Sequence, residues 1–158
     1  MKLASYRDLP LPRDKVWSII NDLEVLKKCI PGCQSLERKS DESLAATVVT
    51  KIGPISAKFG GALSFENIKA PESYRIVFSG QGGAAGFAKG HADVSLEPTD
   101  TGSRLTYTSE ANIGGKLAQI GSRLIESTAN KLADEFFSRL EDEIKKIHEP
   151  SAQAESSD

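Results

Sequence analysis

The sequence has few of the residues on which disulfide frameworks, metal centres and membrane spans depend. It contains two cysteines and two histidines among 158 residues, and aromatic side chains make up 6% of the chain. Two cysteines are too few for a disulfide framework, and no apolar run approaches the roughly 18 residues of a membrane-spanning helix. The 22 acidic and 20 basic residues nearly balance, so no overall positive charge favours nucleic acid.

The N-terminal stretch also lacks the apolar segment of a secretory signal, because Arg7 and Asp8 interrupt it. The chain is 39% hydrophobic and 27% charged. At this length it suits one domain that buries roughly 70% of the surface its unfolded chain exposes. We therefore expect a soluble, cytoplasmic domain over residues 1–148. Residues 149–158 are small, polar and acidic and are expected to form a disordered tail.

The spacing of the hydrophobic residues changes along the chain and divides the domain into three parts. After a short first strand, Pro12 and Asp14 favour the start of a helix, and Asn21-Asp22 ends it and caps a second short helix over 23–29. From residue 34 to about 113, apolar residues alternate with a period of two between turns. This pattern predicts an antiparallel meander, which gives about seven strands with the first one.

Residues 116–147 switch to a period of 3.6 and predict one long amphipathic helix that ends at Pro150. Such a helix needs a broad apolar surface, and the inner face of the sheet is the one available. The expected fold class is therefore α+β, with a curved antiparallel sheet wrapped around a long C-terminal helix. The apolar stripe of the helix is expected at Leu117, Ile120, Leu124, Thr128, Leu132, Phe136, Leu140, Ile144 and Ile147.

The inward strand positions mix large residues with alanine and glycine, and this mixture predicts a cavity. Where short side chains face the helix, a wedge of apolar space remains that suits a ligand better than ordered water. The alternative is that the short side chains let the helix pack closely; Trp17 likewise suits either the core or a ligand contact. The residues expected to line the cavity are Trp17, Ala57, Phe59, Phe65, Phe78, Phe87, Ala92, Tyr107, Ile120, Leu124 and Thr128.

Two further patterns resemble cofactor sites but lack the required context. The run Gly80–Ala85 fits G-x-G-x-x-A, yet the residues after it alternate as a strand instead of opening a helix, so we expect a glycine-rich hairpin at the cavity entrance. Cys29 and Cys33 are spaced C-x3-C without a second pair of zinc ligands. Packing around the intervening turn is preferred over a redox role. We therefore assign no cofactor and no metal.

A third pattern, His91, Asp93 and Ser95, places three polar residues on one face of an expected strand. A serine, a histidine and an aspartate can form a catalytic triad, but a row on an outward-facing strand is more typical of a solvated surface. We therefore assign no catalytic residue.

Several short motifs, in this order, resemble the CoxG family of carbon monoxide dehydrogenase subunits. They are Val16-Trp17 with Asn21-Asp22, Cys29-Ile30-Pro31-Gly32-Cys33, Lys51-Ile52-Gly53-Pro54-Ile55, Gly86-Phe87-Ala88-Lys89-Gly90, and the run from Ile113 to Ile125. The similarity extends from about residue 1 to 147. It implies membership of the START-like (SRPBCC) superfamily, whose helix-grip or Bet v 1-like fold agrees with the order of elements above.

The resemblance implies an accessory protein, not an enzyme. Members accompany molybdenum hydroxylases of the carbon monoxide dehydrogenase type, in roles such as enzyme maturation, membrane recruitment and delivery of a lipid- or quinone-like electron carrier. It thus implies an apolar small molecule in the cavity, hydroxylase subunits as partners, and at most peripheral contact with the inner face of the membrane. Two alternatives remain: a docking module without a ligand, and a polyketide cyclase-like enzyme that would use Tyr74, Tyr107 or Ser109.

Overall fold

Seven strands form one sheet in a computed structural model that describes the backbone of residues 1–156 and the side chains of residues 1–147. The strands are β1 (Lys2–Leu9), β2 (Cys33–Ser40), β3 (Ser43–Ile52), β4 (Ile55–Lys69), β5 (Ser73–Gln81), β6 (Phe87–Thr99) and β7 (Gly102–Gly114). Their order across the sheet is β1-β7-β6-β5-β4-β3-β2, and every neighbouring pair is antiparallel. The predicted meander is therefore confirmed, with β1 added beside β7.

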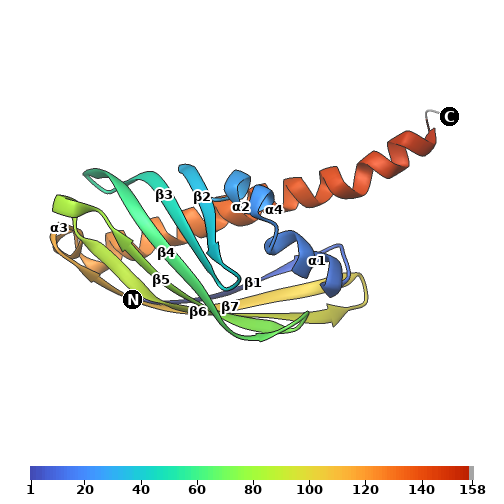
Figure 1. The fold of residues 1–158 in the computed structure, drawn as a ribbon, viewed down its shortest axis with the longest axis horizontal. Coiled ribbons are helices and arrows are strands. Elements are labelled where there is room, and N and C mark those ends of the chain that lie inside the picture. The colour runs from blue at the N-terminus through green and yellow to red at the C-terminus, as the bar shows by residue number, and fades with distance from the viewer. Residues whose placement is uncertain (157–158) are drawn as a thin grey trace.

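Two short helices, α1 (Arg13–Ile20) and α2 (Leu23–Cys29), connect β1 to β2 as predicted. The Asp22 side chain caps α2, because its Oδ1 accepts hydrogen bonds from the backbone N–H groups of Glu24 (2.9 Å) and Val25 (3.3 Å). The two helices place Val16, Ile19, Ile20 and Val25 in the core. They cover one end of the concave face of the sheet (Figure 1).

The C-terminal helix differs from its prediction. A short α3 (Lys116–Gln119) is followed by a break and then by α4 (Ser122–Ser156), which continues past Pro150. The break occurs at Gly121, whose φ of +102° lies in the left-handed region that interrupts a right-handed helix. The expected disordered tail over 149–158 stays a prediction, and its last two residues lie outside the described part of the chain.

The interruption changes which residues of the helix face the sheet. The buried positions of α3 and α4 are Leu117, Ile125, Phe137, Leu140 and Ile144. Leu124 and Ile147 belong to the predicted stripe, yet they are 42% and 50% exposed. A period of 3.6 carried unbroken through Gly121 assigns Leu124 inward, whereas the restarted helix turns Ile125 inward instead.

The densest part of the core lies where α1, α2 and the second half of α4 meet the sheet. Leu140 and Ile144 are fully enclosed there with Val16 and Cys29. Figure 1 shows α4 running along the length of the sheet. Within residues 1–156, no helix combines the length and the apolar character that crossing a membrane requires.

Candidate functional site

An apolar cavity of about 270 Å³ lies between the concave face of the sheet, the two short helices and α4. Its walls come from strands β4 to β7, from α1 and α2, and from the middle of α4. The lining residues are Ile20, Leu26, Ile30, Leu63, Phe65, Tyr74, Ile76, Ala92, Val94, Leu105, Tyr107, Ala133, Phe136 and Phe137. Every lining side chain except the two tyrosines consists of carbon and hydrogen alone, which suits an apolar ligand.

The strand register explains why room remains at this position. Phe65 lies opposite Ile76, and Ile76 lies opposite Ala92, so one cross-strand row of the concave face ends in a short side chain. The next row pairs Phe78 with Gly90. Alternate residues of a strand face the same side of a sheet. The small residues of β6 therefore all leave space on the concave face.

Aromatic contacts hold the helical side of the cavity. The rings of Phe136 and Phe137 meet edge-on with centroids 5.2 Å apart, and Phe137 stacks on Tyr107 at 5.5 Å. Such contacts add to the energy of burial and fix the orientation of each ring. Ala133 lies one turn before Phe137 on α4 and leaves space beside these rings.

The structure brings three of the eleven predicted lining residues to this cavity, namely Phe65, Ala92 and Tyr107. Trp17 lines a neighbouring pocket, together with Phe65. The other seven, Ala57, Phe59, Phe78, Phe87, Ile120, Leu124 and Thr128, are not among the lining residues of the cavity. A ligand contact at any of the eleven stays a prediction.

Some of those seven residues pack near the β3–β4 turn instead. A Cβ atom at Gly53 in this turn would lie 2.8 Å from Leu124 Cδ2 and 3.3 Å from Ile120 Cγ2, so both side chains contact the turn. Thr128 donates its hydroxyl to the Leu124 carbonyl at 2.9 Å within α4. The break at Gly121 decides these positions, and sequence periodicity does not reveal it.

Sequence reasoning missed most of the wall contributed by the helices. Ile20, Leu26 and Ile30 come from α1, α2 and the residue after α2, and Ala133 and Phe137 come from α4. The sequence contains one indication of this wall. Two adjacent phenylalanines in an amphipathic helix cannot both lie on one narrow apolar stripe, so the pair indicates a wider apolar face.

The two cysteines lie outside the cavity lining and are free thiols. Burial, reinforced by the negative charge of Glu143, raises the pKa of Cys29 to about 11. Burial also raises the pKa of Cys33, whose Sγ donates to the Ser35 carbonyl at 3.4 Å. Both thiols therefore hold their protons at neutral pH, whereas a thiolate is the reactive form.

Within the described residues, no group of three or more histidine, cysteine or acidic side chains converges as metal ligands do.

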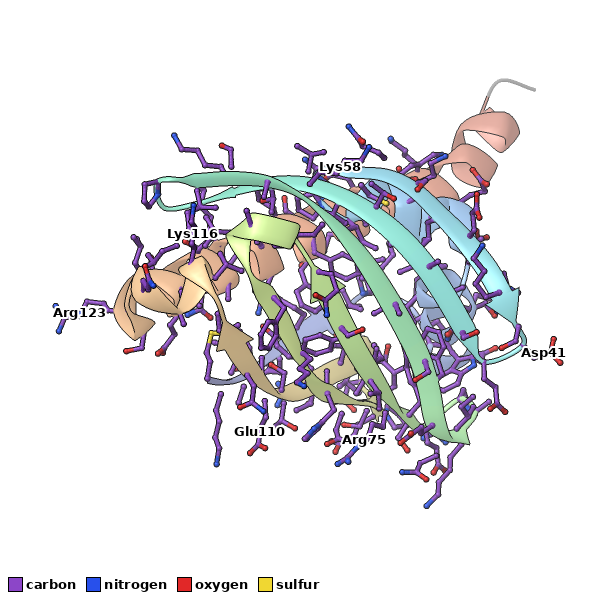
Figure 2. The ribbon with its side chains drawn as sticks, turned by 60° about the vertical axis from the view of Figure 1, so that its left-hand side comes forward. Asp41, Lys58, Arg75, Glu110, Lys116 and Arg123 are labelled. Carbon is purple, nitrogen blue, oxygen red and sulfur yellow. The ribbon has the colours of Figure 1, made fainter. Side chains whose placement is uncertain are left out.

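On the outward face of the sheet, one residue of the row formed by His91, Asp93 and Ser95 pairs with an arginine of the neighbouring strand. Asp93 accepts two hydrogen bonds from Arg75, at 2.8 and 3.0 Å, and this partner lowers the pKa of the Asp93 carboxyl. Arg75 and Glu110 extend from the outward side of the sheet in Figure 2. The Gly80–Ala85 run ends in a single 3-10 turn, η1 (Gly83–Ala85), and β6 begins after Gly86. The predicted glycine-rich hairpin therefore joins β5 to β6, but none of its residues is among those lining the cavity, and its place at the cavity entrance stays a prediction.

A seven-stranded sheet gripping a long helix, with an apolar cavity between them, defines the helix-grip class of START-like and Bet v 1-like proteins. A conserved protein from Geobacillus kaustophilus has this fold with a TM-score of 0.87 at 33% identity, and the match covers 92% of this chain and 96% of that one. A protein from Thermus thermophilus gives a TM-score of 0.70 at 16% identity, covering 93% and 99%. Ara h 8.0201 gives 0.66 at 18% identity, covering 92% and 98%.

The family model for CoxG, a subunit of carbon monoxide dehydrogenase, matches residues 8–145. The chain therefore belongs to the CoxG family of carbon monoxide dehydrogenase subunits, as its motifs predict. No protein with a curated description matches the sequence.

Proposed function

We infer that this protein is a non-enzymatic carrier that holds a lipid- or quinone-like molecule in the apolar cavity. The observation that supports this function is the cavity of about 270 Å³ with its hydrocarbon walls. An enclosed apolar cavity of well under this volume already accepts a small apolar molecule. An aromatic ring system or a short length of acyl chain fits this volume, and the rest of a longer molecule would extend through the opening.

The chemistry of the lining favours binding over catalysis. General acid–base catalysis needs a group whose pKa lies near the working pH, positioned to exchange a proton with the substrate. The ionisable groups on the cavity wall are the hydroxyls of Tyr74 and Tyr107, and burial raises the pKa of both above the usual tyrosine range. Both hydroxyls thus keep their protons and serve as hydrogen-bond donors.

The family name supports the second part of the proposal, which concerns the partner. We propose that the protein serves a molybdenum hydroxylase of the carbon monoxide dehydrogenase type in the cytoplasm, by delivering an electron carrier to it or by assisting its maturation or recruitment. A carrier of apolar molecules must exchange its cargo with a partner or a membrane, because such molecules have little solubility in water.

The distribution of charge supports peripheral contact with a membrane at one end of the molecule. The β3–β4 turn, the η1 turn and α3 lie together at this end (Figure 1). Residues 43–65, 76–92 and 111–125, which approach it, contain no aspartate or glutamate although the chain has a net charge of −2. Their cations define the cationic end: Lys51, Lys58, Lys89, Lys116 and Arg123.

Two apolar residues near the cationic end, Val49 and Leu124, are each 42% exposed. Figure 2 shows Lys116 and Arg123 on the opposite side of the molecule from Asp41. Each basic residue near an anionic bilayer contributes on the order of 1 kcal/mol, and exposed apolar residues add to this by entering the interface. The cationic end therefore suits an anionic membrane surface.

The carrier function is tested by filling the cavity. Ala92→Leu places a larger side chain inside it, whereas Ala62→Leu makes the same change at an exposed position of β4. The uncharged fluorophore N-phenyl-1-naphthylamine reports binding, because its emission rises in an apolar site. We expect binding to the native protein and to Ala62→Leu, and at least about tenfold weaker binding to Ala92→Leu. Equal binding to all three would place the ligand elsewhere and overturn the function.

Mass spectrometry of organic extracts, from protein purified out of its own host, identifies the natural cargo. A lipid or quinone that copurifies with the native protein and is depleted from Ala92→Leu supports the carrier function. A cargo recovered equally from both proteins would contradict binding in this cavity.

A further inference from the structure

A second pocket adjoins the apolar cavity and shares part of its wall. It has a volume of about 210 Å³, and the residues common to the two spaces are Leu26, Phe65 and Tyr74. The second pocket differs in character, because Asn21, Arg38 and Asp41 contribute polar groups to it. It is called the polar pocket below. A molecule with an apolar body and a polar end would meet a matching surface at each end.

Tyr74 stands at the boundary between these spaces and is 7% exposed. Its ring packs edge-on against Trp17, with centroids 5.0 Å apart, and lies 5.6 Å from Phe65. These two contacts hold the ring in one orientation, so the hydroxyl has a fixed position.

The Tyr74 hydroxyl makes no hydrogen bond with the side chains and backbone that the structure describes. In the same part of the chain, no fully enclosed side-chain nitrogen or oxygen lacks a partner. The hydroxyl oxygen is therefore in contact with open space, although the residue around it is buried. A hydroxyl that reaches a pocket and has no protein partner is free to donate to a molecule entering the site.

Other hydrogen-bonding groups line the polar pocket. The guanidinium of Arg38 carries five N–H groups, one of which reaches the Asp41 carbonyl at 3.4 Å. The Asn21 amide donates to the Trp17 carbonyl at 2.8 Å, which fixes the amide with its oxygen available as an acceptor. Arg38 and Asp41 contribute one charge of each sign to the lining, so the polar pocket suits a neutral group better than a carboxylate or phosphate.

We propose, on the basis of the carrier function above, that the Tyr74 hydroxyl donates a hydrogen bond to a neutral carbonyl oxygen at the polar end of the ligand. The apolar body of the ligand lies in the cavity, and its polar end points toward Asn21 and Arg38. Tyr74 thereby selects ketone- or quinone-type molecules over hydrocarbons of the same shape. Burial keeps the hydroxyl protonated, as a donor must be.

The test compares two uncharged probes of nearly equal size, 2-acetylnaphthalene and 2-ethylnaphthalene, which differ by a carbonyl oxygen. Isothermal titration calorimetry measures their affinities for the native protein, for Tyr74→Phe and for Tyr6→Phe. Tyr6 is the matched control, because it is 54% exposed and lines neither the cavity nor the polar pocket.

We expect Tyr74→Phe to bind the ketone about 2- to 10-fold more weakly and the hydrocarbon unchanged, which corresponds to the loss of one hydrogen bond. Tyr6→Phe should leave the ratio of the two affinities as in the native protein. An unchanged ratio in Tyr74→Phe would overturn the role of Tyr74 while leaving the carrier function intact. Failure of both probes to bind the native protein would instead overturn the carrier function.

Thermal unfolding of the ligand-free proteins provides an independent readout. A hydroxyl without a protein partner contributes nothing to the folded state, so Tyr74→Phe should melt at the native temperature or slightly above it. A clear decrease in the melting temperature would show that the hydroxyl has a structural partner, and would overturn the proposal.

Discussion

Arg7 Nη2 lies 2.6 Å from Asp134 Oδ1, and this ion pair joins β1 to the middle of α4 across 127 positions of sequence. The Arg7 guanidinium also lies 4.9 Å from the ring centroid of Phe137, which lines the cavity. Arg7 thus links a surface carboxylate to an aromatic wall of the candidate site. The side chain of Asp134 is 71% exposed, so solvent screens most of the attraction between the charges.

A double-mutant cycle separates the two contacts of Arg7. We expect the coupling of Arg7→Met with Asp134→Asn to be about 0.2–1 kcal/mol, because an exposed ion pair contributes little. Arg7→Met alone should cost more than Asp134→Asn alone, since it also removes the charge above Phe137. Urea denaturation measures all four proteins. A coupling energy well above this range would show that the pair is shielded from solvent.

The same substitution, leucine to alanine, should change the stability of the protein by different amounts at two positions of α4. Leu140 is fully buried among α1, α2 and the sheet, and Leu140→Ala should lower the free energy of unfolding by about 2–5 kcal/mol. Leu124 is 42% exposed, and Leu124→Ala should cost under about 1 kcal/mol. Equal losses would mean that α4 continues the helical phase of α3 through Gly121, with Leu124 turned inward.

The raised pKa of Cys29 predicts a loss of stability in alkaline solution. The pKa of the buried thiol is about 11 against an ordinary 9.0, so the folded state holds this proton more tightly than the unfolded state does. Its contribution to stability is complete below about pH 9 and disappears as the pH rises toward about 11. Over this interval the native protein should lose up to about 1.4 kcal/mol per pH unit from this group.

Cys29→Ala is the matched variant, because it cannot titrate at this position. We expect it to be less stable at neutral pH but to show a shallower decline between about pH 9 and pH 11, as measured by urea denaturation at each pH. Parallel declines in the two proteins would indicate that Cys29 titrates in the folded state at its ordinary pKa.

Charge reversal at the cationic end predicts weaker binding to anionic vesicles. The double variant Lys58→Glu with Arg123→Glu removes two cations of that end, whereas Lys15→Glu with Lys69→Glu makes the same change in net charge at exposed positions elsewhere. Co-sedimentation with phosphatidylglycerol vesicles at about 0.1 M salt should decrease for the first variant only. Equal decreases would indicate that total charge, not this surface, governs the contact. Phosphatidylcholine vesicles serve as the uncharged control.

The sequence alone determined the order of the elements and the facing of the strands. Alternation assigned Phe59, Leu63 and Phe65 to one side of β4, and the ladder pairs Leu63 with Phe78 and Phe65 with Ile76 as one concave surface. The cap at Asp22 was also evident, because this signal acts within a few residues of the backbone it shapes. Local chemistry sufficed for all of them.

Tertiary structure alone decided which inward residues surround the cavity. Phe59 and Phe65 belong to the same face of β4, yet only Phe65 reaches the cavity, because α1 and α2 close one end of the concave face and the turn at Gly53 meets α4 near the other. The left-handed backbone of Gly121 resets the helix, and the pairing of β1 with β7 brings Arg7 to Asp134. Contacts between residues far apart in sequence fix these features, and the hydrophobic period of the sequence does not predict such contacts.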